Sequence, residues 1–306
     1  MIIALSGGIG GAKLALGLSR ILPPEELLII ANTGDDFEHY GLTICPDTDT
    51  LLYTLAGLDN PRLGWGRADE SWAFMETLAT LGGADWFRLG DRDLSLHVLR
   101  SHRLRAGDSL SAITDDFRQR FGIGPRILPM SDDPVRTKIG TDQGWLDFQD
   151  WFVRLRAEPL ARAVRFVGIE QARPQPVLLE ALRAQPRGIV ICPSNPFISI
   201  EPILAVPGLR DAIKACGAPV VAVSPIIAGQ AVKGPTARMF EALGVTPSAA
   251  AVAARYGDLL DGYVMEHGDD GTGITPRVFH AATLMRDLTD KTALARQVLA
   301  AIEALR

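Results

Sequence analysis

A glycine-rich stretch near the start of the chain restricts the fold more than any other part of the sequence. An apolar run at residues 1–5 leads into Ser-Gly-Gly-Ile-Gly-Gly-Ala-Lys, and Leu14, Leu18 and Ile21 then repeat at helical spacing. A second apolar run, at residues 27–31, ends in Asn-Thr-Gly-Asp-Asp. A buried strand, a glycine loop, a helix and a second strand with an acidic loop are typical of an α/β protein with a phosphate site.

Four glycines in this stretch suit a backbone that wraps around an anion. Gly7, Gly8, Gly10 and Gly11 leave the backbone free to adopt positive φ and keep Cβ atoms off the ligand side. Backbone N–H groups can then converge on a phosphate at the start of a helix that we expect near Gly11, and Lys13 adds a charge in its first turn. A tight turn that binds nothing is the alternative.

The spacing of the glycines argues against two familiar phosphate motifs. Counted from Gly8, the dinucleotide fingerprint requires glycine or alanine where this chain has Lys13. A Walker A loop requires glycine at Ala12 and a hydroxyl group at Leu14. We therefore expect neither a dinucleotide-dependent oxidoreductase nor a P-loop kinase.

Further polar loops follow other apolar runs that indicate buried parallel strands. These runs span residues 27–31, 188–192 and 219–223. The loops after the last two contain Ser194, Asn195, Ser224 and Pro225. Because parallel strands end at the same edge of a sheet, we expect these loops to meet the glycine loop in one ligand crevice.

Residues 59–124 differ from the rest, because tryptophans and helical periodicity replace the strand-like runs. We predict an α/β fold with two parts. Residues 1–58 and 125–306 form a Rossmann-like domain with a mostly parallel sheet, and residues 59–124 form an inserted helical subdomain.

Shorter elements are predicted within these parts. We expect a helix over residues 49–58, a hairpin of residues 135–139 and 144–148, and a C-terminal helix from about Asp290. Strand and helix alternation should resume near Val164.

Composition limits the partners of the chain. The net charge of −5 and the pI near 5.6 argue against nucleic acid and anionic membranes as partners. No apolar stretch approaches the ~20 residues that span a bilayer. Three cysteines without a paired motif fit a reducing compartment. We expect a cytoplasmic protein.

Six motifs together resemble the 2-phospho-L-lactate transferase family, whose members assemble the deazaflavin coenzyme F(420). They are the Ser-Gly-Gly-x-Gly loop, Pro-Asp-Thr-Asp-Thr at 46–50, Leu-Gly-Asp-Arg-Asp at 89–93, Leu-Pro-Met-Ser-Asp-Asp-Pro at 128–134, Pro-Ser-Asn-Pro at 193–196 and Val-Ser-Pro-Ile at 223–226. They occur in the family's order from residue 2 to about residue 235. The match is weak after Gly257.

The resemblance implies a magnesium-dependent transferase. The donor would be a guanosine-diphospho adduct of a lactyl, enolpyruvyl or glyceryl phospho-acid. The acceptor would be the terminal ribityl hydroxyl of 7,8-didemethyl-8-hydroxy-5-deazariboflavin, and GMP would leave. The family also suggests a homodimer. A nucleotide-sugar-binding regulator of the same fold, without transferase activity, is the alternative.

The resemblance also suggests roles for individual residues. Asp49 would act on the acceptor hydroxyl and Asp47 on the metal, since two acids in one loop can both face a metal ion; capping of the following helix is the alternative for this pair. The predicted metal ligands are Asp47 and Asp49. The predicted deazaflavin contacts are Asp49, Arg88, Ser224 and Pro225, and the predicted nucleotide contacts are Gly7, Gly8, Gly10, Gly11, Lys13, Ser194 and Asn195. Trp65 or Trp86 could form an apolar wall for the flat acceptor.

Weaker candidates lie elsewhere. Asp132 and Asp133 are second-choice metal ligands, with a plain Asp-Pro turn as the alternative. Lys233 is a loop cation near phosphate or a solvated side chain. His97 and His102 show no metal spacing, and we expect both at the surface.

Overall fold

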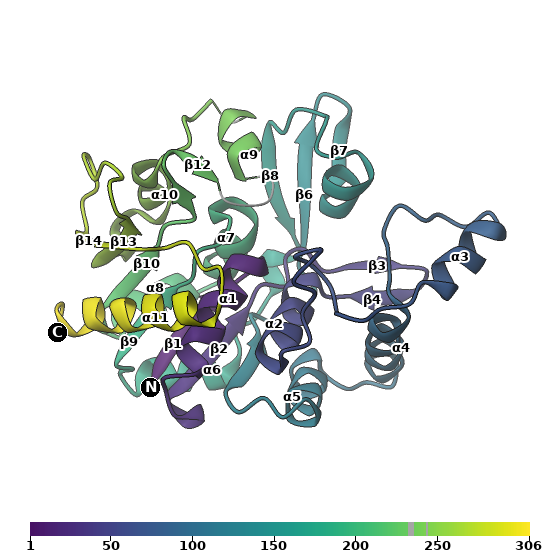
Figure 1. The fold of residues 1–306 in the computed structure, drawn as a ribbon, viewed down its shortest axis with the longest axis horizontal. Coiled ribbons are helices and arrows are strands. Elements are labelled where there is room, and N and C mark those ends of the chain that lie inside the picture. Colours follow the sequence, from purple (N-terminus) through teal and green to yellow (C-terminus); the bar gives the residue numbers. More distant parts are fainter. Residues whose placement is uncertain (232–235, 243) are drawn as a thin grey trace.

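The computed structural model describes residues 1–231, 236–242 and 244–306. Within these ranges seven parallel strands form the central sheet, in the order β14-β13-β10-β9-β1-β2-β5 (Figure 1). The strands are β1 (Ile2–Ser6), β2 (Leu27–Ala31), β5 (Arg126–Pro129), β9 (Gly188–Ile191), β10 (Val220–Val223), β13 (Gly262–Glu266) and β14 (Arg277–Ala281). The predicted Rossmann-like α/β class is confirmed.

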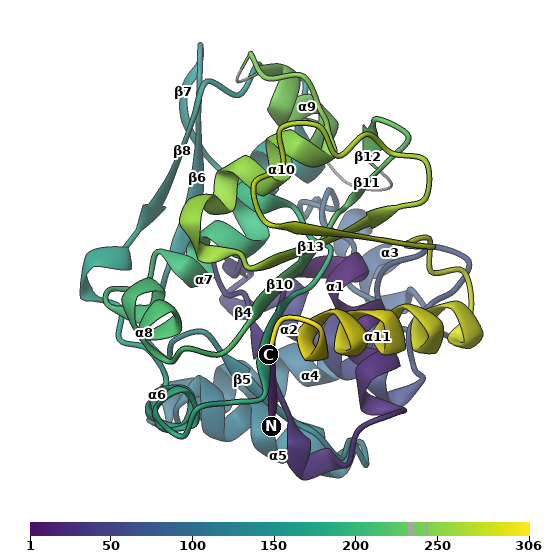
Figure 2. The ribbon, with the colours of Figure 1, turned by 90° about the vertical axis from the view of Figure 1, so that its left-hand side faces the viewer.

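Helices cover both faces of this sheet. On one face α1 (Gly8–Ser19) packs between α2 (Pro46–Ala56) and α11 (Leu288–Glu303) (Figure 1). The other face carries α6 (Pro176–Arg183), α7 (Glu201–Leu204), α8 (Leu209–Ala215) and α10 (Ala249–Tyr256), as the side view in Figure 2 shows. Because alternate strand residues point to opposite faces, Ile3 and Leu5 join one core while Ile2 and Ala4 join the other.

The order of the strands reverses at β1. This strand lies between β9 and β2, with Leu5 opposite both Ile191 and Ile30. The chain proceeds outward from β1 in one direction through β2 and β5, and in the other through β9, β10, β13 and β14. Such a switch point opens a crevice at the carboxyl ends of the strands.

The segment predicted as a helical insertion contains α3 (Ala73–Thr80), α4 (Asp91–Arg105) and α5 (Leu110–Arg120). Helix α5 packs on β5, and its Ile113 and Phe117 belong to the same core as α1 and α2. Helix α3 lies farther out, and its Met75 clusters with Ile44 and Leu89 (Figure 1). The domain boundaries stay a prediction.

Two small antiparallel elements stand beside the main sheet. The hairpin β3 (Phe37–His39) and β4 (Leu42–Ile44) was not predicted. The predicted hairpin around residue 142 is confirmed as β6 (Arg136–Thr141) and β7 (Gly144–Asp147).

The region after β7 agrees with the prediction in part. Strand and helix alternation resumes near Val164 as predicted, because β8 (Ala163–Val167) is followed by α6, β9, α8 and β10. Strand β8 itself lies outside the parallel sheet: it pairs antiparallel with β6, and its half-exposed residues suit a sheet with a solvated face. The short β11 (Ile226–Ile227) and β12 (Gln230–Ala231) form a further hairpin, and α9 (Thr236–Ala242) follows. Across the described ranges, every helix is too short or too polar to cross a membrane.

The contact between α1 and α11 yields a first prediction. A Cβ on Gly17 would lie 2.2 Å from the backbone oxygen of Lys291, so Gly17→Ala must push α11 away. Overpacking costs about 1–3 kcal/mol, more than the ~1 kcal/mol that alanine gains in helix propensity. We expect a lower Tm for Gly17→Ala. Gly271→Ala is the control, because its Cβ would meet no atom closer than 3.6 Å. An unchanged Tm for Gly17→Ala would contradict the close approach.

Candidate active site

A cavity of about 850 Å³ opens at the carboxyl edge of the sheet, beside the switch point. Its walls include Gly7 after β1, Asp35 after β2, Ser194 after β9 and Ser224 after β10. The predicted convergence of four loops is therefore confirmed. The cavity is lined by Gly7, Gly8, Gly10, Lys13, Asp47, Asp49, Arg88, Ser194, Asn195, Ser224 and Pro225 among the predicted site residues. Gly11 is the predicted residue that does not line it.

The glycine stretch begins the helix earlier than predicted. Gly7 is the N-cap residue of α1, and Gly8 has a φ of +65° at the first helical position. Lys13 therefore lies in the second turn, and the predicted start near Gly11 was wrong. The Lys13 ammonium donates to the backbone oxygen of Met285 at 2.9 Å, at the wall of the cavity.

Contacts within the protein explain why these positions are glycine. A Cβ on Gly10 would lie 2.3 Å from the carbonyl oxygen of Pro193, and one on Gly11 would lie 2.4 Å from Ser6 Oγ. The Ser194 hydroxyl donates to the Gly7 carbonyl at 2.5 Å. The loops after β1 and β9 thus pack directly on each other, and contact of the glycine amides with phosphate stays a prediction.

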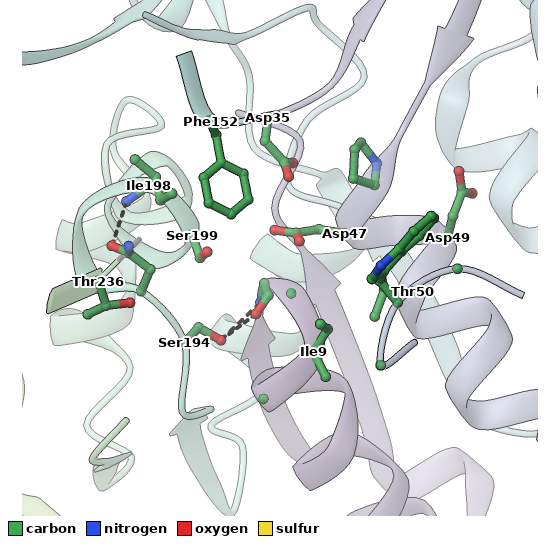
Figure 3. Close-up of a pocket in the computed structure, with 18 of the residues that line it drawn as sticks. Ile9, Asp35, Asp47, Asp49, Thr50, Phe152, Ser194, Ile198, Ser199 and Thr236 are labelled. Atoms are coloured by element: carbon green, nitrogen blue, oxygen red, sulfur yellow. Dashed lines mark hydrogen bonds between the residues drawn. The ribbon is translucent and has the colours of Figure 1, made fainter. Parts of the chain in front are cut away.

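Two buried carboxylates face each other in the cavity, as Figure 3 shows for Asp35 and Asp47. The side-chain amide of Asn32 donates to Asp47 at 2.9 Å and to Asp35 at 3.4 Å. Burial raises the pKa of Asp47 to about 6, although hydrogen bonds from Asn32 and the Gly8 amide oppose the shift. Burial, reinforced by the charge of Asp47, raises the pKa of Asp35 well above its ordinary value. The partner that the two acids share is an uncharged amide.

Asp47 and Asp49 lie in the first turn of α2, so the predicted loop was wrong. Pro46 occupies the first helical position, and the N-cap residue Cys45 makes no side-chain capping bond. Residues two apart on a helix differ by about 200° around its axis. Figure 3 accordingly shows the two carboxylates pointing to different sides of α2. This arrangement does not support one metal ion shared by both acids.

Asp49 has a charged partner that the sequence reasoning missed. The guanidinium of Arg100, on α4, binds both Asp49 carboxylate oxygens, and the Nη1–Oδ2 distance is 3.1 Å. His97 lies beside the pair, with Nδ1 3.6 Å from Asp49 Oδ2 and Nε2 3.2 Å from an oxygen of Asp93. His97 is only 1% exposed, so its predicted surface position was wrong, whereas His102 is exposed as expected.

The same residues could be taken for a metal centre. Ligand atoms of Asp49, Asp93 and His97 all lie within 4.8 Å of one another. However, Arg100 already binds Asp49, and the Tyr53 hydroxyl donates to Asp93. A cation placed among them would lie beside a buried guanidinium, so these residues form an ion-pair network that suits a metal poorly.

Comparisons with known proteins agree with this geometry. The family model described as 2-phospho-L-lactate transferase CofD matches residues 2–298. The chain belongs to this family. It is thus a transferase of coenzyme F(420) biosynthesis.

Curated relatives match over nearly their whole length. A phosphoenolpyruvate transferase of Kitasatospora aureofaciens is 44% identical, covering 100% of this chain and 98% of the relative. The protein of the same name from Mycolicibacterium smegmatis is 38% identical over 96% of each chain. A solved structure of a Bacillus halodurans protein has a TM-score of 0.65 at 15% identity and covers 99% of this chain and 98% of its own; it supports the fold alone.

The remaining candidate residues of this transferase lie in different surroundings. Arg88 is exposed at the rim and its guanidinium lies 4.2 Å from the centre of the Trp72 ring. Asn195 Oδ1 accepts from the Phe197 amide at 2.9 Å, so it caps the turn after β9. Asp132 and Asp133 line a separate cavity of about 500 Å³. Lys233 lies outside the described residues.

The raised pKa of Asp47 yields a prediction for the metal-free transferase. An acid with a pKa near 4 when unfolded and about 6 when folded binds more protons in the folded state, so its contribution to stability falls as pH rises through that window. The pKa of Asp35 is also raised, so its contribution to stability falls in the same direction. With chelator present, Asp47→Asn should become more stable than wild type as pH rises from 4.5 to 7.5, by up to about 3 kcal/mol. Urea unfolding at several pH values measures this, and a pH-independent difference would contradict it.

Proposed function

We propose that this chain transfers a phosphoenolpyruvyl group from a guanosine-diphospho adduct to the terminal hydroxyl of 7,8-didemethyl-8-hydroxy-5-deazariboflavin, with release of GMP. The family supports a transferase of this pathway, and the names of the relatives favour phosphoenolpyruvyl over lactyl and glyceryl. The alternative of a nucleotide-sugar-binding regulator would share only the fold.

The observation that carries this proposal is that two chemically different sets of residues line one cavity. One set combines the glycine loop with the Asp35–Asp47 pair and Ser194. The other set is aromatic and comprises Trp65, Trp86 and Phe87. A charged diphosphate fits the first and a flat tricyclic ring fits the second, so both substrates can meet in one crevice.

Asp35 and Asp47 suit the magnesium ion that we propose. Magnesium prefers carboxylate oxygens, and two buried acids that share only an amide gain most from a divalent cation. When bound, the ion neutralises charge on the diphosphate. Asp49, which the sequence predicted as a metal ligand, would not bind this ion, because both of its carboxylate oxygens accept hydrogen bonds from Arg100.

The chain's own residues would organise the attack. Asp49, at the cavity wall, would accept a hydrogen bond from the ribityl hydroxyl and orient its oxygen. That oxygen forms a bond to the phosphorus bearing the organic acid, while the bond from this phosphorus to the bridging oxygen breaks and GMP leaves with the electron pair. The hydroxyl proton leaves through Asp49 to solvent. The Gly10 amide, in the first turn of α1 at the cavity wall, would hold the diphosphate, whereas the Gly8 amide already donates to Asp47.

A direct assay tests the proposal. Purified protein is incubated with the deazaflavin acceptor, Mg²⁺ and each of the three donor adducts, and GMP and the flavin product are measured by mass spectrometry. We expect the phosphoenolpyruvyl donor to react fastest and chelator to stop the reaction. Absence of GMP release with every donor, together with tight nucleotide-sugar binding, would favour the regulator instead.

A variant of Asp49 tests its assigned role. Asp49→Asn keeps the size of the side chain but loses the charge that orients the hydroxyl, so kcat should fall by about 100-fold or more. Binding of GDP, measured by calorimetry, should stay near wild type because the nucleotide contacts lie elsewhere. Asp132→Asn is the control, since this acid lines the separate cavity. Full activity of Asp49→Asn would refute the role.

A further inference from the structure

Arg100 is one of the largest side chains that are completely enclosed in the described part of the chain, at 1% exposure. Besides Asp49, its Nη1 contacts the carbonyl oxygen of Thr43 at 3.3 Å and His97 Nδ1 at 3.3 Å. An arginine enclosed in this way is retained only where its charge has a fixed partner. Burial opposes the charge, but Asp49 and the other acidic groups around the guanidinium together outweigh burial and raise the pKa of Arg100 above its ordinary value.

A second group of contacts fixes the opposite side of the network. Asp93 and His97 stand one turn apart on α4, and the Tyr53 hydroxyl of α2 donates to Asp93. Burial favours the neutral form of Asp93, but hydrogen bonds from His97 and Tyr53 prevail and lower its pKa. Helix α4 is thus joined to α2 at both Asp49 and Tyr53.

The amino terminus of α4 is tied in turn to the segment that carries the apolar wall. Glu70 accepts hydrogen bonds from the backbone amides of Arg92 at 2.7 Å and Asp93 at 2.9 Å. Asp91 accepts from the amides of Ala73 and Phe74, at 3.1 and 3.0 Å, at the start of α3. The position of α4 therefore depends on the segment that would contact the acceptor.

We propose that Arg100 and His97 are positioning residues, which hold the Asp49 carboxylate in the one orientation that receives the acceptor hydroxyl. This inference rests on the proposed function. A bidentate guanidinium fixes the plane of the Asp49 carboxylate, and Asp49 lines the cavity. The helical segment thereby supplies the orientation of a catalytic residue that belongs to the Rossmann-like part.

The variant Arg100→Lys provides the sharpest test, because it keeps the positive charge but loses the planar guanidinium that binds both carboxylate oxygens. We expect Arg100→Lys to lower kcat by about 30-fold while the KM for both substrates changes less than about 3-fold. Arg103→Lys is the matched control, since Arg103 lies on the same helix and pairs with Asp108 and Asp116 instead. GDP binding should be unchanged in both variants.

A double-mutant cycle separates positioning from general damage. If Arg100 acts through Asp49, then Arg100→Lys combined with Asp49→Asn should be no slower than Asp49→Asn alone, within about 2-fold. The inference would be overturned if the kcat losses of the two single variants multiplied in the double variant, or if Arg100→Lys kept full activity. Should Arg100→Lys not fold, His97→Gln enters the same cycle and decides by the same criterion. An inactive wild-type protein would instead refute the proposed function.

Discussion

The close contact between the loops after β1 and β9 is the constraint on which the site depends. A carbonyl oxygen at Pro193 occupies the space of a Gly10 Cβ, and Ser194 binds the Gly7 backbone. Any side chain at these positions would separate the two strand ends and widen the switch point. Because α1 starts directly at Gly8, the same contact places the amino terminus of α1 at the wall of the cavity.

Helical geometry then directs the two acids in the first turn of α2 to different sides. Asp47 and Asp49 both favour the amino terminus of α2, where the helix dipole stabilises negative charge. Their angular separation directs Asp47 towards Asp35 and Asp49 towards Arg100. The short motif at residues 46–50 therefore supplies one acid to each of two separate groups of side chains. This separation follows from the helix and could not be predicted while the motif was taken for a loop.

Local patterns were enough to predict the parallel sheet and its ligand edge, and most of the predicted site residues line the cavity, because apolar runs and the loops after them are short-range signals. The hairpin of β3 and β4 was not predicted, because its turn lacks the usual Asn-Gly sequence. Tyr40 and Gly41 occupy the turn instead, with φ of 51° and 69°. The roles of Arg100 and His97 were not predicted, because both side chains become buried only when α4 packs on α2. Their spacing with Asp93, at i, i+4 and i+7 on one helix face, was the available signal.

The balance of charge around the cavity decides where a divalent cation fits. On the α4 side, Asp49 and Asp93 are matched by Arg100, His97 and the Tyr53 hydroxyl. On the opposite side, burial raises the pKa values of Asp35 and Asp47, so a cation beside them would stabilise their ionised forms. A cation would gain little beside Arg100 and much beside Asp47. In the proposed function, the acceptor would therefore meet a site organised by fixed protein charges, whereas the donor would meet acids that a cation could neutralise.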